Sequence, residues 1–406
     1  MSPQKILILG AGAAGTAAAR ILGGSDAVTV TLIGRTGETP YNRTLVNKGV
    51  AIGVLTLEQA SIPGVKITAG DTALEVDPEA KTVRFASGRV EHYDALVIAT
   101  GSAPRHLHDT IPGAAGTTLD RVRTLHSLDD AVAVRDLLAS LGRPARVVIS
   151  GAGLVAAETA TLLQERGHHV TLLARDSTPG VSVFGDELAQ RLNDAHRQHL
   201  DTAFGRTLAT IRESGDRLEL TLDDGTELTA DLLIVAHGTS PTAPSPWDGA
   251  VLVDASQRTA APNVYAAGGV AVHDDPALGV WRIDHWADAV AQGEHAARTL
   301  LADFGKGEQL GSYQPRAPFT ATVHGAMIAG AGLTGNRTAT RIDSSDPLVV
   351  IHEHNMAPVG VLGLDAAPAV FGWMPRLHTP VALDREALAS TGTGAAHLHN
   401  RLATGK

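Results

Sequence analysis

Two glycine-rich segments carry the clearest chemical pattern in this sequence. Gly10, Gly12 and Gly15 follow the apolar run 6–9 at the spacing G-x-G-x-x-G, and an alanine-rich stretch comes next. In a strand, turn and helix of this kind, the first glycine permits a sharp turn, the second lets a diphosphate reach the backbone, and the third lets helix and strand pack closely. The segment therefore predicts a dinucleotide-binding turn; the alternative is a glycine turn without a ligand.

A second unit of the chain repeats the first. Gly151 follows the apolar strand predicted at residues 146–150, and a helix and a second apolar strand come after it. The interval from Gly10 to Arg35 is 25 residues and that from Gly151 to Arg175 is 24, so the two units share their elements and their spacing. An internal repeat of this kind predicts two nucleotide ligands.

The second strand of each unit ends without the carboxylate that would accept ribose hydroxyls. Arg35 and Arg175 stand at these two places. A carboxylate would repel a 2′-phosphate, whereas an arginine can pair with it through two hydrogen bonds. At the second unit we therefore expect NADPH, with NADH possible; the alternative is that Arg175 is an ordinary surface residue.

Segments outside the two units add further candidates. Ala99, Thr100 and Gly101 end a buried strand and are small enough for phosphates or a sugar chain to lie against their backbone.

Short alternating strands between residues 65 and 93 predict a β-meander. Two tryptophans, the second of them Trp286, precede a long alanine-rich helix, where they could form a core or subunit contact or flank a planar cofactor.

The composition excludes several classes of function. A chain of 406 residues with 44% hydrophobic residues is long enough for two or three domains. The absence of cysteine excludes a redox-active disulfide, a cysteine nucleophile, an iron–sulfur cluster and a thiolate zinc site, and the 18 histidines lack metal-ligand spacing, so we expect no metal. The net charge of −10 argues against nucleic acid as a partner. Since there is no apolar run of bilayer length and no recognisable leader, we expect a cytoplasmic protein with no membrane partner.

Taken together, these segments resemble the FAD-dependent pyridine nucleotide-disulfide oxidoreductases, and within them the ferredoxin, rubredoxin and putidaredoxin reductase branch. The resemblance covers nearly the whole chain and is weakest in its last quarter. The lack of cysteine fits this branch, which uses no dithiol relay. The matching residues are Pro40, Tyr41, Arg43 and Lys48 in a P-Y-x-R-P-x-L-S-K loop, residues 94–102, residues 151–158, Gly238 with Pro241, and Arg282, Asp284 and Trp286 in an R-x-E-x-W motif.

The resemblance implies an α/β fold with two three-layer, Rossmann-like dinucleotide-binding domains and a small α+β C-terminal domain. We expect the FAD-binding domain at 1–110 and 239–310, interrupted by the NAD(P)-binding domain at 111–238, with an interface domain at 311–406. The last domain often contributes to a dimer contact in this family, so a monomer and a homodimer both remain open.

The activity that the resemblance implies is that of an NAD(P)H-dependent flavoprotein oxidoreductase. Hydride would pass from nicotinamide C4 to flavin N5, and electrons would continue to a ferredoxin-type protein or a small organic acceptor. Lys48 and Glu158, as an ion pair beside flavin N5, are the candidate catalytic residues, and Trp286 would lie near the ring system. The candidate cofactor-binding residues are Gly10, Gly12, Ala14, Gly15, Arg35, Arg43, Lys48, Ala73, Ala99, Thr100, Gly101, Gly151, Gly153, Leu154, Val155, Glu158, Arg175, Gly238, Gly268, Gly269 and Trp286.

Departures from the family pattern leave two alternatives open. The family has a carboxylate near Arg35, an aspartate in place of Gly269, and an aromatic F-W-S cluster where this chain has residues 318–322. One alternative is a degenerate reductase-fold protein with weakened or lost FAD binding and a non-redox binding role. The other is a flavoenzyme that reduces a small molecule instead of a protein. Retention of Lys48 and Glu158 favours an enzyme.

Overall fold

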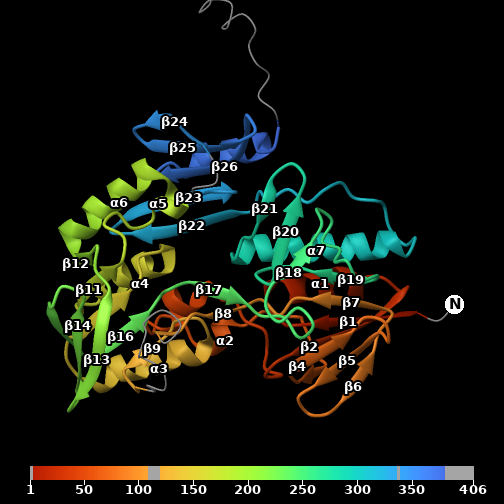
Figure 1. Cartoon of the computed structure of the whole chain (residues 1–406), viewed down its shortest axis with the longest axis horizontal. Helices are drawn as coiled ribbons and strands as arrows, with labels where there is room; N and C mark the ends of the chain where they lie inside the picture. The colour runs from red at the N-terminus through yellow and green to blue at the C-terminus, as the bar shows by residue number, and fades with distance from the viewer. Residues whose placement is uncertain (1–2, 108–118, 336–338, 380–406) are drawn as a thin grey trace, which may run out of the picture.

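The computed structural model describes residues 3–107, 119–335 and 339–379. These residues form three five-stranded sheets, and each sheet is the centre of one of three lobes (Figure 1). The chain builds most of the first lobe, crosses to the second, and returns to complete the first before it forms the third.

The first sheet is parallel and is covered on both faces. On one face, Ile6 and Ile8 pack against α1 (Ala13–Gly23) and α7 (Trp286–Asp303). On the other face, the alternate residues Leu7 and Leu9 pack against strands of smaller sheets, which gives a three-layer arrangement. In spatial order, the strands of the sheet are β19 (Val264–Ala266), β7 (Ala95–Ile98), β1 (Gln4–Leu9), β2 (Val28–Gly34) and β3 (Ala69–Gly70).

Two small three-stranded sheets cover that second face. The first is the predicted meander, although it begins at residue 73, because residues 69–70 pair in parallel with β2 instead. Its strands are β4 (Ala73–Asp77), β5 (Thr82–Phe85) and β6 (Val90–His92). The strands of the other sheet are β18 (Val251–Val253), β20 (Ala271–Asp275) and β21 (Gly279–Trp281).

The second sheet repeats the plan of the first. Val147 and Ile149 pack against α3 (Leu128–Ser140) and α4 (Leu154–Glu165) on one face, and Val148 packs against a three-stranded antiparallel sheet on the other. The five parallel strands, in order, are β12 (Asp201–Phe204), β11 (His169–Ala174), β10 (Arg146–Ser150), β16 (Leu232–Val235) and β9 (Val122–Arg123). The covering strands are β13 (Leu208–Ser214), β14 (Arg217–Leu222) and β15 (Glu227–Ala230).

The third sheet is antiparallel and forms an α+β lobe. One face is covered by α8 (Ala367–Trp373), which is followed by the 3₁₀ turn η3 (Met374–Arg376). The other face packs against α4, α5 (Val181–Phe184) and α6 (Asp186–His199) of the second lobe. Its strands, in order, are β22 (Pro318–Val323), β23 (Ala326–Gly332), β26 (Ala357–Leu364), β25 (Leu348–His354) and β24 (Ala339–Ser345).

A two-stranded antiparallel ribbon joins the first two lobes. Its strands, β8 (Ser102–Pro104) and β17 (Thr239–Pro241), are the points where the chain leaves the first lobe and returns to it. Two short helical segments also precede the crossing, namely η1 (Val46–Val50), a turn of π-helix, and α2 (Leu57–Ala60). The ribbon places the two glycine turns on either side of a shared boundary.

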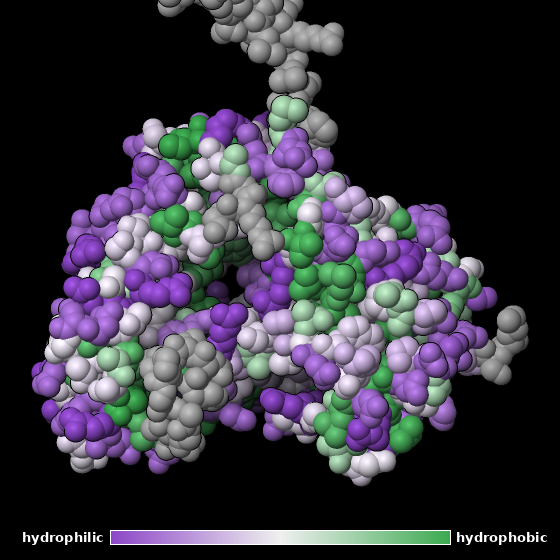
Figure 2. All heavy atoms as spheres, in the orientation of Figure 1, coloured by the Kyte–Doolittle hydropathy of each residue, from purple (hydrophilic) through white to green (hydrophobic). Residues whose placement is uncertain are grey.

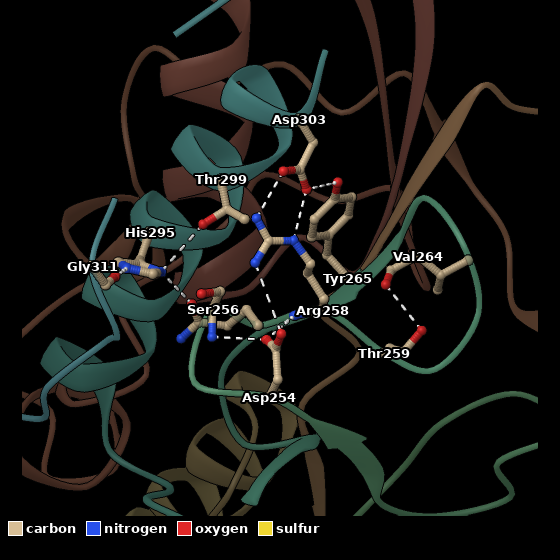
Figure 3. Close-up of polar contacts among 11 residues, drawn as sticks. Asp254, Ser256, Arg258, Thr259, Val264, Tyr265, His295, Thr299, Asp303 and Gly311 are labelled. Carbon is tan, nitrogen blue, oxygen red and sulfur yellow. Dashed lines mark hydrogen bonds and ion pairs between the residues drawn. The ribbon is translucent and has the colours of Figure 1, made fainter. Parts of the chain in front are cut away.

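A polar network fixes the end of α7 (Figure 3). Arg258 donates two hydrogen bonds to the Asp303 carboxylate, at 2.8 and 2.7 Å, and the Tyr265 hydroxyl donates to the same group at 2.7 Å. His295 Nε2 lies 3.0 Å from the carbonyl oxygen of Gly311, in the connection to the third lobe. Because Tyr265 belongs to β19, the network ties α7 to the edge of the first sheet.

The fold class predicted from the sequence is confirmed by these three lobes. The predicted strands of the two repeated units and the alanine-rich helix after Trp286 are present. The predicted boundary at residues 110/111 lies outside the described residues, and the last predicted domain is described only to residue 379. Within the described ranges, the chain forms no helix of the length and apolar character that a membrane crossing requires.

Candidate functional site

The first glycine turn is shaped to receive a diphosphate. Gly10 has φ +102°, and a Cβ there would lie 2.6 Å from the carbonyl carbon of Ala99, so only glycine fits. A Cβ at Gly12 would point into open space, and Gly12 begins α1 without a capping side chain. The first amides of α1 therefore face a space that a phosphate can enter, which fits the predicted role.

The second glycine turn has the same form. Gly151 has φ +115°, and a Cβ there would lie 2.8 Å from the carbonyl carbon of Ala236. Gly153 begins α4 without a capping side chain and has open space beside it. Leu154 and Val155 form the first turn of α4, and half of the Val155 surface is exposed. Both predicted turns can therefore accept a nucleotide diphosphate.

The arginines at the two strand ends differ in their surroundings. Arg175 follows β11 with 83% of its side chain exposed, and its Nε lies 3.5 Å from Asp176 Oδ1. Arg35 follows β2 and is exposed as well. Its charge also acts to lower the pKa of His126.

Arg43 lies at the boundary between the first and second lobes. Its Nη1 donates a hydrogen bond of 3.0 Å to Nε2 of His126, which precedes α3. Burial lowers the pKa of His126 to about 4, and the charges of Arg43 and Arg35 add to this effect. His126 is therefore neutral near pH 7, as an acceptor for Arg43 must be.

The two candidate catalytic residues are brought together. Lys48 lies in η1 and Glu158 in α4, and their Nζ and Oε1 atoms are 3.7 Å apart. Asn47 Nδ2 donates a 3.0 Å hydrogen bond to Oε2 of Glu158. The backbone amide of Thr322, in β22, lies 3.5 Å from Oε1. Glu158 of the second lobe therefore receives groups from η1 and from the third lobe.

Two adjacent aromatic residues, His285 and Trp286, lie at the start of α7. The ring centroids of His285 and Phe319 are 5.4 Å apart. Burial lowers the pKa of His285, and the nearby charge of Lys48 lowers it further. Trp286 begins α7 and lines, with Ala13 of α1, a cavity of about 390 Å³. Trp281 instead stacks on His273 inside the first lobe, with ring centroids 3.8 Å apart, so it is a core residue.

The remaining small residues of the predicted site lie around the first glycine turn and the ribbon. Thr100 donates its hydroxyl to the carbonyl of Thr242, and Gly101 accepts a 3.1 Å hydrogen bond from the amide of the same residue. A Cβ at Gly268 would lie 3.0 Å from Cβ of Ala14. Ala99 is buried behind Gly10. The carbonyl oxygen of Gly238 accepts a hydrogen bond from the Arg105 amide, and that of Gly269 accepts one from Arg282 Nε.

Ala73 is the predicted site residue that the structure does not connect to the others. It begins β4, pairs with Phe85 and packs against the core below the first sheet.

In the space-filling view, a hollow opens at the centre of one face, between the lobe with α4 and the lobe with α7 (Figure 2).

Four further residues belong to this region and were not among the predicted site residues. Asn47 and His285 adjoin predicted residues in the sequence, so their neighbours are a signal that could have identified them. Asp284 is part of the R-x-E-x-W match, but the motif does not show what its carboxylate contacts. His126 carries no sequence signal, because its partner Arg43 is 83 residues away.

Comparison with known proteins decides the family. Residues 4–293 match the family model described as pyridine nucleotide-disulphide oxidoreductase. The chain belongs to this family. It is an NAD(P)H-dependent flavoprotein oxidoreductase, with FAD and a nicotinamide dinucleotide as its cofactors.

Named relatives and a solved structure agree with this assignment. The chain is 30% identical over 322 residues to the ferredoxin–NAD(+) reductase component of the anthranilate 1,2-dioxygenase system of Burkholderia cepacia, covering 74% of this chain and 76% of the relative. It is 28% identical over 321 residues to the corresponding component of the p-cumate 2,3-dioxygenase system of Pseudomonas putida, covering 74% and 75%. The covalent putidaredoxin reductase–putidaredoxin complex superposes with a TM-score of 0.79 at 22% identity over 92% of this chain and 93% of that one, which is evidence for the fold.

The residues present fit the cofactors of a pyridine nucleotide-disulphide oxidoreductase. Each glycine turn offers uncapped helix amides and open space, and the ion pair lies at the boundary between the lobes that carry them. A bound flavin would supply a hydride acceptor that can also release single electrons. The chain itself would supply position, charge and exclusion of water.

Proposed function

We propose that this chain transfers hydride from NAD(P)H at the second glycine turn to FAD at the first, and passes the electrons to a ferredoxin-type protein. The observation that carries the proposal is the Lys48–Glu158 ion pair, which joins α4 to η1, a segment that packs on the second lobe and borders the first. A charge pair at this boundary can orient two ring systems that enter from opposite sides. The two relatives described above are named ferredoxin–NAD(+) reductase components, which supports the choice of acceptor.

The roles proposed for individual residues follow from their positions. Lys48 would place its ammonium group beside the hydride acceptor, and Glu158, whose side chain is only 12% exposed, would hold it there. Trp286 would lie at the edge of the ring system and His285, kept neutral by burial, would help exclude water. No proton transfer by a side chain is needed, because hydride carries both electrons directly.

We also propose that NADPH is preferred over NADH. Arg175 supports this proposal, because its guanidinium is 83% exposed at the end of β11 and holds only a loose contact with Asp176. An exposed guanidinium can turn toward a 2′-phosphate and bind it through two hydrogen bonds. The carboxylate of Asp176 is the feature that would oppose this choice.

The domain division that we propose follows the sheets. Residues 1–110 and 239–310 would form the FAD domain, residues 111–238 the NAD(P) domain, and residues 311–406 the C-terminal domain. The ribbon of β8 and β17 supports the two crossing points. Since α4 packs on the third sheet, the C-terminal domain would also help to position Glu158.

A coupled assay tests the acceptor. The protein reconstituted with FAD is supplied with NADPH, cytochrome c and either a ferredoxin or no ferredoxin, and a quinone replaces both proteins in a parallel reaction. We expect cytochrome reduction that depends on the ferredoxin. Quinone reduction without any ferredoxin-dependent rate would assign the enzyme to small-molecule acceptors instead.

A further inference from the structure

The carboxylate of Asp284 is held rigidly beside the first glycine turn. Asp284 lies two residues before α7, and the hydrogen bonds that its carboxylate accepts from the described residues all end on Oδ2. Ser102 Oγ donates to it at 2.7 Å, Arg282 Nη2 donates at 2.9 Å, and the Thr239 hydroxyl is the third donor. Because Ser102 belongs to β8 and Thr239 to β17, the carboxylate is hydrogen-bonded to both strands of the ribbon.

The other oxygen, Oδ1, lies against Gly269. A Cβ built on Gly269 would be 2.9 Å from Cγ of Asp284 and closer still to Oδ1. The backbone of Gly269 has no left-handed φ, so any residue could adopt it, and the Asp284 carboxylate alone excludes a side chain there. Position 269 is where the family resemblance places an aspartate, and this chain fills the same space with a carboxylate from position 284.

Oδ1 is available to a ligand. Among the described residues, no hydrogen bond reaches it, and 29% of the side chain is exposed. Burial acts to raise the pKa of Asp284, but hydrogen bonds from Thr239 and Ser102 and the charge of Arg282 lower it overall, so the group stays ionised. The charge of Arg43 also acts to lower this pKa.

We propose that Asp284 is a cofactor-binding residue whose Oδ1 accepts a hydrogen bond from a hydroxyl of the sugar-alcohol chain of FAD. An ionised acceptor beside a glycine turn suits a hydroxyl donor, whereas it would repel the adjoining phosphates. Gly269 and Asp284 therefore act as a pair, in which the missing side chain of one residue makes room for the carboxylate of the other. This inference rests on the proposed function, because it requires FAD at the first turn.

The test measures binding to the protein freed of flavin, by quenching of FAD fluorescence and by competition with ADP. Asp284→Ala should weaken FAD about 10- to 100-fold, the effect of losing one hydrogen bond to a charged group, and leave the affinity for ADP unchanged because ADP lacks the sugar-alcohol chain. Asp274→Ala, which removes an exposed carboxylate from β20, is the matched control and should bind both ligands normally.

A second pair of variants tests the coupling. Gly269→Asp alone should lose FAD binding, because its side chain meets the Asp284 carboxylate, whereas Gly269→Asp combined with Asp284→Ala should bind FAD within about threefold of the original protein. Failure of the original protein to bind FAD would refute the proposed function. Normal FAD binding by Asp284→Ala, or an equal loss of FAD and ADP, would refute this inference alone. If Asp284→Ala does not fold, Asp284→Asn is measured instead. In that case, unchanged FAD affinity in both the folded Asp284→Asn variant and the folded Gly269→Asp, Asp284→Ala double variant overturns the inference.

Discussion

At the level of single residues, Glu158 is held by contacts that come from two distant parts of the chain. Asn47 and the Thr322 amide fix its two oxygens, and Lys48 lies 3.7 Å from one of them. Fixed in this way, the carboxylate can hold the Lys48 ammonium in one place without spending further conformational entropy. Its charge should therefore matter more for the rate than for the binding of either dinucleotide.

We predict that Glu158→Gln slows flavin reduction by NADPH about 10- to 100-fold while FAD stays bound, because Lys48 loses the charge that positions it. Stopped-flow loss of the visible flavin band measures this rate. Glu187→Gln is the control, since it removes one carboxylate from an exposed ion pair with Arg191 on α6. If both variants are reduced at the original rate, the role assigned to the ion pair is wrong.

Arg175 allows a prediction about coenzyme choice. Replacement by alanine should weaken NADPH about 10- to 100-fold and change NADH by less than about threefold, since only the 2′-phosphate loses a charged hydrogen bond. Equilibrium titrations of the FAD-loaded protein with each coenzyme measure both values. Equal losses for the two coenzymes would show that Arg175 does not read the 2′-phosphate.

Asp288 is buried in α7 with an unusual pKa. Burial raises this pKa to about 6, against hydrogen bonds of 2.7 Å from the Tyr313 hydroxyl and 2.6 Å from Gln292 Nε2. Because the folded-state pKa lies above the unfolded value, the stabilising effect of the bound proton is complete below about pH 4 and is lost as the pH rises through 6. Gln292 also accepts the amide of Gly268, so the acid supports the first glycine turn.

Asp288→Asn should remove this pH dependence, because the amide copies the neutral acid at every pH. Relative to the variant, the original protein should lose roughly 3 kcal/mol of unfolding free energy between about pH 4 and pH 7. Denaturant unfolding of both proteins across this range measures the difference. A difference that stays constant with pH would contradict the assignment of a raised pKa to Asp288.

Some of these site residues could be predicted from the sequence, and others could not. The glycines of both turns were predictable because their spacing is local. The contact between Lys48 and Glu158 was expected only from the family resemblance, because the two residues lie 110 positions apart and no spacing rule connects them. The position of Asp284 against Gly269 depends on the loop between β21 and α7, so only the structure shows it.

At the level of elements, α1 and α7 cross closely because small residues line their contact. A Cβ on Gly293 would lie 2.8 Å from Cα of Ala14, in the first turn of α1. Gly293→Ala should therefore lower the unfolding free energy by about 2 kcal/mol through overpacking, although alanine otherwise favours a helix. Thermal or denaturant unfolding measures this change.

Gly23→Ala is the matched control for that substitution. It lies at the exposed end of α1, where a Cβ would meet no atom within 4 Å, so we expect unchanged or slightly increased stability. Equal stabilities for the Gly23 and Gly293 variants would mean that the helices can move apart at little cost.

Elements were predicted best where the pattern is strong and local. The units β1–α1–β2 and β10–α4–β11 follow from apolar runs on either side of a glycine turn. Helices α3 and α6 were not predicted from the sequence. The predicted meander included residues 69–70, because the pairing of these two residues with β2 is decided by tertiary contacts.

At the level of the whole molecule, the second and third lobes and the segment of η1 meet at the Glu158 carboxylate. The repeat predicted two nucleotide sites but not their mutual orientation, because the ribbon of β8 and β17 and the packing of α4 on the third sheet set that orientation. The arrangement explains how a chain without cysteine can carry out redox chemistry. Two bound dinucleotides supply the reacting atoms, and the lobes bring them together.

The most direct test of this account is an anaerobic visible titration of the FAD-loaded protein with NADPH and, separately, with NADH. We predict that the flavin band disappears with either coenzyme, and at lower concentrations of NADPH. A protein that binds FAD and yet keeps its oxidised spectrum in an excess of both coenzymes would contradict the central claim that the two sites exchange hydride.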